Sequence, residues 1–261
     1  MNRATPDVNC FRITQATSHE FRDLYVENTT LAVIKNGRKR IRKNGGDLFY
    51  ALPGQLVIFP SQTFVTFENF RANDSDYIAD CVCYSDDALG QVFPSYEATP
   101  EREAFLLNEC PSPLAEMVST IQSMQHSGLP EELVSHRMME PLIWLRSIGI
   151  HLSVATEISI EIKLRKLIGS DFSKKWQMRE VAAKLACSEA TLRRRLAACN
   201  TSFSSILVNV RLEHGLALLH TSSLAISQIA EECGFANPSH FSDSFKKKFD
   251  TTPTAMRHLE S

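Results

Sequence analysis

The chain has 261 residues, of which 43% are hydrophobic and 22% are charged, and its formal net charge is −2. This balance supports a hydrophobic core and argues against a chain that is basic along its whole length. No apolar run reaches the roughly 18 residues of a membrane span, and the segment MNRATPDVNC lacks the apolar region of a secretory signal. We therefore expect a cytoplasmic protein that does not enter a membrane, with its seven scattered cysteines as reduced thiols.

Residues 24–95 are expected to form β-strands. The segments LAVIKNGRKRI, FYALPGQLVIFP, TFVTFENF and YIADCVCY are short, rich in β-branched or aromatic residues, and bounded by polar or turn-forming residues. Asn36-Gly37 suits a type I′ hairpin turn, and Pro53-Gly54 marks a second turn. Strands at this spacing predict a small sandwich or barrel.

Two features of this region suggest binding. The stretch NGRKRIRKNGG, residues 36–46, has five basic residues in six consecutive positions. It is interpreted as a solvated hairpin tip, or else as a site for an anionic ligand, for DNA or for an acidic partner protein. A further hypothesis is an apolar ligand pocket inside the sandwich, lined by Val33, Phe59 and Phe67.

Metal and cofactor chemistry is not expected. No histidine lies between His19 and His126, so the strands cannot supply a histidine cluster. Cys81 and Cys83 are two apart on one strand and therefore share a face. They are interpreted as core residues, with a metal or redox pair as the alternative.

After residue 98 the pattern becomes helical. Leu114, Met117, Val118 and Ile121 have helical spacing, and PEELVSHRMMEPLIWLRSIG continues as a helix that Pro141 is expected to kink or divide. A third amphipathic segment, EISIEIKLRKLI, leads to a boundary near Gly169-Ser170-Asp171. We expect an α+β protein with two domains, residues 1–165 (β-rich over 24–95, helical over 100–165) and an all-helical 166–261.

The last 90 residues or so contain a weak repeat. VAAKLACS at 181–188 aligns with IAEECGFA at 229–236, and each copy predicts a short helix, a tight turn and a second helix. Two helix-turn-helix copies are far more specific than one. Residues 170–261 hold 12 Lys and Arg against 9 Asp and Glu, a net charge of +3, while residues 1–169 hold 16 against 21, or −5.

The second helix of the first copy, residues 188–198, carries three consecutive arginines in TLRRRLAACN. At about 100° per residue, Leu192 and Leu196 define its buried face and Arg194 points almost directly away from it. Arginine forks can bond guanine edges while neighbouring arginines hold phosphates. The stripe is therefore interpreted as a major-groove reading surface, with a solvated face paired to Glu189 as the alternative.

The corresponding helix of the second copy spans 238–249 and buries Phe241, Phe245 and Phe249. Asn237 suits its N-cap and Pro238 its first turn. This helix presents Asp243 where the first presents Arg194, so we expect weaker base reading here. Ser239, His240 and Asp243 are also triad residue types, but they share one exposed face without oxyanion donors, so we do not expect an enzyme.

The helix between the copies, residues 203–219, would span roughly 26 Å. This length suits two units that enter successive major grooves about 34 Å apart on one face of the DNA.

Residues 171–258 resemble the DNA-binding domain of the AraC/XylS family of bacterial transcription regulators. The matching motifs are LRRRL, RLEHGLALL and IAEECGFANPSHFSDSFKKKFDTTPTAMR, and LRKLIGSDFSKKWQMREVA resembles a subgroup of enterobacterial acid-stress and virulence regulators. The resemblance implies an activator that binds promoter DNA and contacts RNA polymerase. It further implies a cupin-like N-terminal effector and dimerisation domain, which leaves a small-molecule effector and a homodimer open as partners.

Together, the repeat and the resemblance predict a sequence-specific double-stranded DNA-binding regulator without a cofactor. The alternative is a ligand-sensing or protein-interaction module whose DNA binding is controlled by a partner. The residues expected to face bases are Ala190, Thr191, Arg193, Arg194, Ser239, His240, Ser242 and Asp243. Those expected to contact phosphates are Arg195, Lys246, Lys247 and Lys248. Two departures from the family pattern are the small Ala190 and the acidic Asp243.

Overall fold

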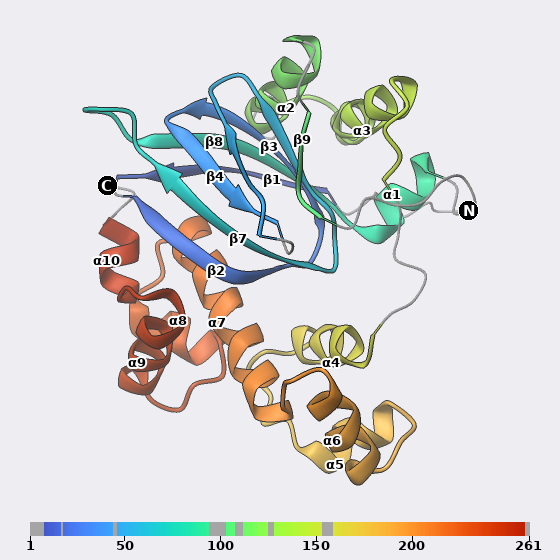
Figure 1. Ribbon diagram of the computed structural model, residues 1–261, viewed down its shortest axis with the longest axis vertical. Helices are drawn as coiled ribbons and strands as arrows, with labels where there is room; N and C mark the ends of the chain where they lie inside the picture. The colour runs from blue at the N-terminus through green and yellow to red at the C-terminus, as the bar shows by residue number, and fades with distance from the viewer. Residues whose placement is uncertain are drawn as a thin grey trace. The chain divides into compact units, whose positions relative to one another are not determined.

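A computed structural model describes residues 8–16, 18–43, 46–93, 103–107, 112–124, 128–152 and 159–258 (Figure 1). The chain divides into two compact units, Met1–Ala155 and Thr156–Ser261, which we describe separately. The division lies before the expected boundary at 165/166, because the helix α4 (Ile160–Gly169) packs its buried Leu164 and Ile168 into the core of the second unit.

The N-terminal unit contains a sandwich of two antiparallel sheets, as the sequence predicted. One sheet has the strand order β1-β8-β3-β6-β9 and the other has the order β2-β7-β4-β5. The bounds are β1 (Val8–Gln15), β2 (His19–Val26), β3 (Thr29–Asn36), β4 (Arg38–Arg42), β5 (Leu48–Ala51), β6 (Leu56–Phe59), β7 (Thr63–Phe70), β8 (Tyr77–Tyr84) and β9 (Phe105–Leu107).

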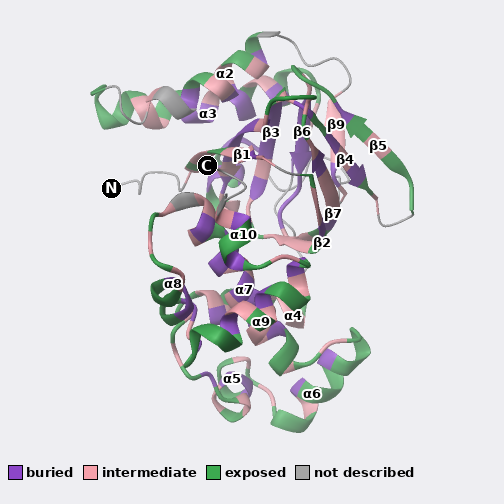
Figure 2. Ribbon diagram, turned by 90° about the vertical axis from the view of Figure 1, so that its left-hand side faces the viewer, coloured by how far each residue is buried: buried purple, intermediate pink, exposed green. Residues whose placement is uncertain are grey.

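Three strands lie wholly or largely outside the region expected to be β-rich. β1 and most of β2 precede residue 24, and β9 lies where helix was expected. β1 and β2 carry many polar and half-exposed residues, so their sequences lack the apolar runs that marked the central strands. β3 and β6 are buried almost throughout, whereas the edge strand β5 is largely exposed (Figure 2).

The two turn dipeptides connect the sheets and do not close hairpins. β3 pairs with β6 and β8, while β4 pairs with β5 and β7, so Gly37 carries the chain from one sheet to the other. Its φ is +76°, and a Cβ there would lie 2.3 Å from the carbonyl oxygen of Phe70. Pro53-Gly54 likewise joins β5 to β6 of the opposite sheet. The expectation of a type I′ hairpin at Asn36-Gly37 was therefore wrong.

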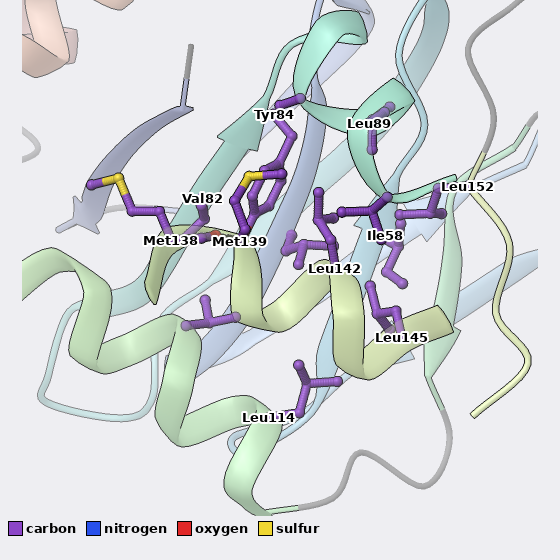
Figure 3. Close-up of a cluster of buried hydrophobic side chains, with 14 of the residues drawn as sticks. Ile58, Val82, Tyr84, Leu89, Leu114, Met138, Met139, Leu142, Leu145 and Leu152 are labelled. Atoms are coloured by element: carbon purple, nitrogen blue, oxygen red, sulfur yellow. Dashed lines mark hydrogen bonds between the residues drawn. The ribbon is translucent and has the colours of Figure 1, made fainter. Parts of the chain in front are cut away.

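Two hydrophobic clusters flank the five-stranded sheet. One lies between the sheets and includes Ile34, Ile41 and Phe59. The other lies against the helices α1 (Asp86–Val92), α2 (Ser112–Met124) and α3 (Glu131–Ser147), where Leu114, Leu142 and Leu145 approach Ile58, Val82 and Tyr84 (Figure 3).

This division separates the residues of the hypothesised apolar pocket. Val33 points towards the helices, whereas Phe59 and Phe67 belong to the cluster between the sheets. Neighbouring residues of a strand alternate between its faces, so a β3 residue next to Ile34 cannot share that interior with it. In α3, Pro141 is buried within one undivided helix, so the expected division does not occur.

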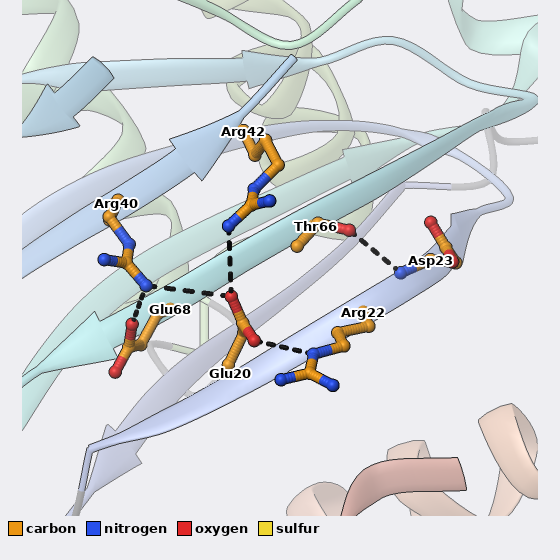
Figure 4. Close-up of polar contacts among 7 residues, drawn as sticks. All are labelled: Glu20, Arg22, Asp23, Arg40, Arg42, Thr66 and Glu68. Atoms are coloured by element: carbon orange, nitrogen blue, oxygen red, sulfur yellow. Dashed lines mark hydrogen bonds and ion pairs between the residues drawn. The ribbon is translucent and has the colours of Figure 1, made fainter. Parts of the chain in front are cut away.

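Within the basic stretch, Arg38–Arg42 form β4, an interior strand of the four-stranded sheet, so these residues are not a hairpin tip. On its outer face, Arg40 pairs with Glu68 and Glu20, while Arg42 approaches the same Glu20 carboxylate (Figure 4). Arg22 also donates to Glu20, at 2.7 Å. Much of the outward charge of this stretch is therefore neutralised within the sheet.

Lys39, on the same strand, points into the sandwich and is only 2% exposed. Its Nζ donates to Oδ1 of Asn69 at 2.6 Å and lies 3.6 Å from the centre of the Phe67 ring. Burial lowers the pKa of Lys39 to about 7. Among the described residues no carboxylate pairs with this amine, and the buried hydroxyl of nearby Tyr77 has no hydrogen-bond partner.

The C-terminal unit is all-helical, as predicted. Its core under the first helix-turn-helix copy includes Leu164, Ile168 and Trp176. Besides α4, the helices are α5 (Met178–Lys184), α6 (Glu189–Ala198), α7 (Phe203–Thr221), α8 (Ile226–Glu232), α9 (Pro238–Phe249) and α10 (Pro253–His258). Across the described parts of the chain, no helix combines the length and apolar character that crossing a membrane requires.

Replacing Gly37 with alanine is expected to destabilise the N-terminal unit by about 2–4 kcal/mol, because a left-handed φ and a backbone clash act together. Gly54→Ala is the matched control: φ is +85°, but no atom lies within 4 Å of the added Cβ, so we expect a loss of about 1 kcal/mol. Amide hydrogen exchange in β3 and β4 measures both losses. Equal losses would show that the contact with Phe70 is not what requires glycine.

Candidate nucleic-acid interface

Both predicted helix-turn-helix copies are present in the C-terminal unit. In the first, α5 and α6 are joined through Ala186, whose φ is +51°, and in the second, α8 and α9 are joined through Gly234, whose φ is +73°. The side chain of Ser188 caps α6 by accepting from the amide of Thr191 at 3.1 Å. Asn237 caps α9 by accepting from the amide of Ser239 at 2.7 Å. The turns and caps set where each second helix begins.

Helix α6 has the two faces that the sequence predicted. Leu192 and Leu196 are fully buried, whereas Arg193, Arg194 and Arg195 are exposed. Among the described residues none of the three guanidinium groups forms an ion pair, and Glu189 does not engage them. The alternative of a salt-bridged surface face is therefore not what the structure has. The three arginines therefore form a cationic surface without ion-pair partners in the described part of the chain, on the side of α6 that faces away from its buried leucines.

Small residues flank these arginines. Ala190, Ala197 and Ala198 are exposed, so nothing bulky on their part of the surface would hold the helix away from a groove. Thr191 is half-buried, and its hydroxyl shares a 2.9 Å hydrogen bond with that of Ser188. Its side chain is therefore committed in part to the helix cap.

Helix α9 buries Phe241, Phe245 and Phe249 and exposes Ser239, His240 and Asp243, with Ser242 half-buried. The ring of His240 packs edge-on against Phe235, with 5.5 Å between the ring centres. This contact orients the imidazole on the outer surface.

The three lysines at the end of α9 differ in their surroundings. Lys246 and Lys247 are exposed. Lys248 is 13% exposed, and its Nζ lies 3.0 Å from Oε1 of Glu213 on α7. Lys248 is thus engaged inside the domain, while the other two remain available to a phosphate.

Charge is distributed unequally between the two copies. Residues 170–200 hold seven Lys and Arg against three Asp and Glu, whereas residues 222–258 hold four against four. Besides the arginine triplet, Lys175, Arg179 and Lys184 are exposed around α5, and our sequence reasoning did not single them out. The presence of four basic residues within positions 174–184 was the available indication.

Helix α7 packs closely against the second copy. A Cβ on Gly215 would lie 2.8 Å from the ring of Phe241, so α9 crosses α7 at this glycine. Arg211 donates to the carbonyl oxygens of Phe172 and Lys174 at 3.0 and 2.8 Å, which ties α7 to the loop that precedes α5. The connecting helix is therefore part of the packed domain and not a free spacer.

Comparisons with known proteins agree with this geometry. Residues 181–258 match the model of a family described as a helix-turn-helix domain. The transcriptional regulator SirC of Salmonella typhimurium strain SL1344 is 39% identical over 102 residues, 39% of this chain and 35% of SirC. The urease operon transcriptional activator of Escherichia coli is 37% identical over 91 residues, 35% of this chain and 31% of the activator. The chain thus spans about a third of the length of these relatives.

The whole fold has a counterpart among solved structures. A crystal structure of an apo ToxT variant from Vibrio cholerae has a TM-score of 0.73 and 17% identity, covering 100% of this chain and 99% of that one. Wild-type ToxT with a bound unsaturated fatty acid gives a TM-score of 0.70, also at 17% identity, covering 100% and 98%. At this identity the likeness establishes the fold, and it confirms the predicted sandwich followed by a helical domain.

The two turns predict opposite responses to exchanging alanine and glycine. Ala186→Gly is expected to stabilise the C-terminal unit by up to about 1 kcal/mol, because it relieves a left-handed φ. Gly234→Ala is expected to cost more than about 2 kcal/mol, since the new Cβ would also lie 2.4 Å from the carbonyl oxygen of Phe172. Hydrogen exchange of the α5, α6, α8 and α9 amides measures both, and a destabilising Ala186→Gly would contradict the assignment of strain.

Proposed function

We propose that this chain is a transcription activator of the AraC/XylS type that binds specific double-stranded DNA. The match of residues 181–258 to a helix-turn-helix family and the similarity to SirC over 102 residues support this proposal, as do the sequence motifs. The observation that carries the proposal is the arginine triplet of α6, unpaired and exposed over the buried Leu192 and Leu196. An unpaired cationic stripe on a capped helix is what a major groove lined by phosphates and guanine acceptors attracts.

The proposed contacts follow from exposure and direction. Base-edge contacts are assigned to Ala190, Thr191, Arg193 and Arg194 in the first copy, and to Ser239, His240, Ser242 and Asp243 in the second. Phosphate contacts are assigned to Arg195, Lys246 and Lys247. The expected phosphate contact of Lys248 is withdrawn, because its ammonium group is paired with Glu213.

The first copy is proposed to supply most of the affinity. Its excess of basic residues favours phosphates, whereas the second copy has no net charge and places Asp243 on its reading face. A carboxylate there can accept from cytosine N4 while it repels nearby phosphates. The second copy is therefore proposed to contribute more to sequence discrimination than to affinity for DNA.

The similarity to the urease operon transcriptional activator supports a role in activation, and we therefore propose RNA polymerase as a partner in the cytoplasm. The N-terminal domain, residues 1–165 in the expected division, is proposed to carry effector binding and dimerisation. Lys39 favours an effector role, because a buried amine without an acidic partner can be neutralised by a ligand carboxylate. ToxT, which shares the fold, binds an unsaturated fatty acid, so we propose an apolar monocarboxylate.

Arg194→Ala is expected to weaken binding to a duplex selected from a random library by about ten- to a hundredfold, through lost base recognition at one position. Lys247→Ala is the matched comparison: it should weaken all duplexes alike and lower the salt slope by about one. Gel shifts at several salt concentrations distinguish them. An equal loss of affinity for all duplexes in Arg194→Ala would indicate that Arg194 contacts a phosphate. If residues 156–261 bound selectively only together with a partner, the partner-controlled alternative would be favoured.

Carboxylate binding at Lys39 is expected to depend on pH. The protonated amine is the binding form, and free Lys39 loses its proton above its pKa of about 7. Affinity should therefore be level below pH 7 and fall up to about tenfold per pH unit above it. Calorimetric titration of the full chain with a submicellar unsaturated fatty acid measures this slope. Lys39→Met should abolish both affinity and slope, and the exposed Lys35→Met should change neither; equal binding by Lys39→Met would refute the site.

A further inference from the structure

One carboxylate on α7 joins helices from both ends of the C-terminal unit. Oε2 of Glu213 accepts from Nη1 of Arg165 on α4 at 2.8 Å. Its other oxygen, Oε1, lies 3.0 Å from Nζ of Lys248 on α9. Helix α4 precedes the first helix-turn-helix copy and α9 is the reading helix of the second. The two oxygens of a single side chain therefore meet the helix that packs beneath the first copy and the second helix of the second copy.

The three charged groups are almost completely buried, so each depends on its ionic partners. The side chains of Arg165, Glu213 and Lys248 are 4%, 13% and 13% exposed. Glu161, one turn earlier on α4, lies 3.3 Å from Arg165 and balances its charge. Two cations and two carboxylates thus meet in these contacts. Without Glu213, Lys248 would lose the carboxylate that it faces, and α4 and α9 would lose their common anchor.

A second set of contacts holds α7 on another side. Arg211 lies about 200° around the helix from Glu213 and bonds the loop carbonyls of Phe172 and Lys174. The Phe172 ring stacks on His214 with 3.8 Å between ring centres, and Phe172 lies against the turn glycine, Gly234. These contacts hold the loop before α5 on the turn of the second copy, but they do not reach the distal end of α9, where Lys248 lies.

We propose that Glu213 is a positioning residue that fixes the angle between the two reading helices and thereby sets the DNA spacing that the protein accepts. This inference rests on the proposed DNA-binding function. Each added base pair turns one half-site by about 34° and moves it about 3.4 Å relative to the other. A domain with a fixed angle cannot follow that change, whereas a domain with a released α9 follows it in part.

The experiment uses the full-length protein and duplexes selected by the wild type from a random library, each rebuilt with one base pair inserted or deleted between its two contacted segments. The wild type is expected to bind the altered duplexes at least 30-fold more weakly than the parent. Glu213→Gln should bind the parent a few-fold more weakly but reduce this spacing penalty below about fivefold. Lys248→Met, which breaks the contact with α9 alone, should reduce it similarly.

Glu161→Gln is the matched control, because it removes a carboxylate that contacts α4 only, and its spacing penalty should equal that of the wild type. Equal penalties in Glu213→Gln, Lys248→Met and the wild type would overturn the positioning role, even if parent affinity falls. If Glu213→Gln does not fold, Lys248→Met decides by the same comparison. If the wild type selects no duplex, the proposed function fails and the spacing role fails with it.

Discussion

The proposed DNA-reading surface depends on two buried rows of apolar side chains. Leu192 and Leu196 hold α6 against the core, and the three phenylalanines of α9, Phe241, Phe245 and Phe249, do the same for the second copy. Burial of these side chains fixes the rotation of each helix about its own axis. If α6 were turned by one residue, a guanidinium group would move towards an apolar core without a partner, at a cost of several kcal/mol. Hydrophobic packing thus decides which polar side chains of the two helices face outwards.

Charge is handled differently in the N-terminal unit. There the arginines of β4 face outwards and are largely balanced by Glu20 and Glu68, while Lys39 on the same strand points between the sheets. The amine has one amide oxygen and the face of Phe67 in place of an acidic partner. Such a group is costly to bury, so an anionic ligand that neutralises it would gain binding energy from the arrangement. Lys39 is thus the side chain through which the sandwich is proposed to bind an effector.

The C-terminal unit combines the two proposed reading helices with a closely packed connecting helix. Helix α7 is packed on one side by Arg211 and Gly215 and on another by Glu213. Specific DNA recognition by two small helices needs both to reach their grooves together. We propose that the ionic contacts of Glu213 constrain an orientation that apolar packing alone would allow to vary.

Local sequence was sufficient for the features that repeat along the chain. The spacing of Leu192 and Leu196 predicted the outer position of Arg194, since a helix has a fixed angle per residue. The strand-rich segment likewise predicted a sandwich. The same kind of reasoning could have found Lys39, because strand alternation places it on the side of the apolar Ile41.

Other features depend on parts of the chain that meet only in the folded protein. Asn36-Gly37 has the composition of a hairpin turn, but it joins different sheets because β3 and β4 find other partners. Val33 and Phe59 also lie in different clusters. The sequence could not show this, because β3 is buried on both faces and therefore lacks the polar alternation that distinguishes one face from the other. The pairing of Lys248 with Glu213 is set by the crossing of α7 and α9, which no local pattern encodes. Periodicity therefore predicted the buried and exposed faces of α6 and α9 from sequence alone, while long-range packing decided the strand partners, the surroundings of the buried amine and the contacts between α7 and α9.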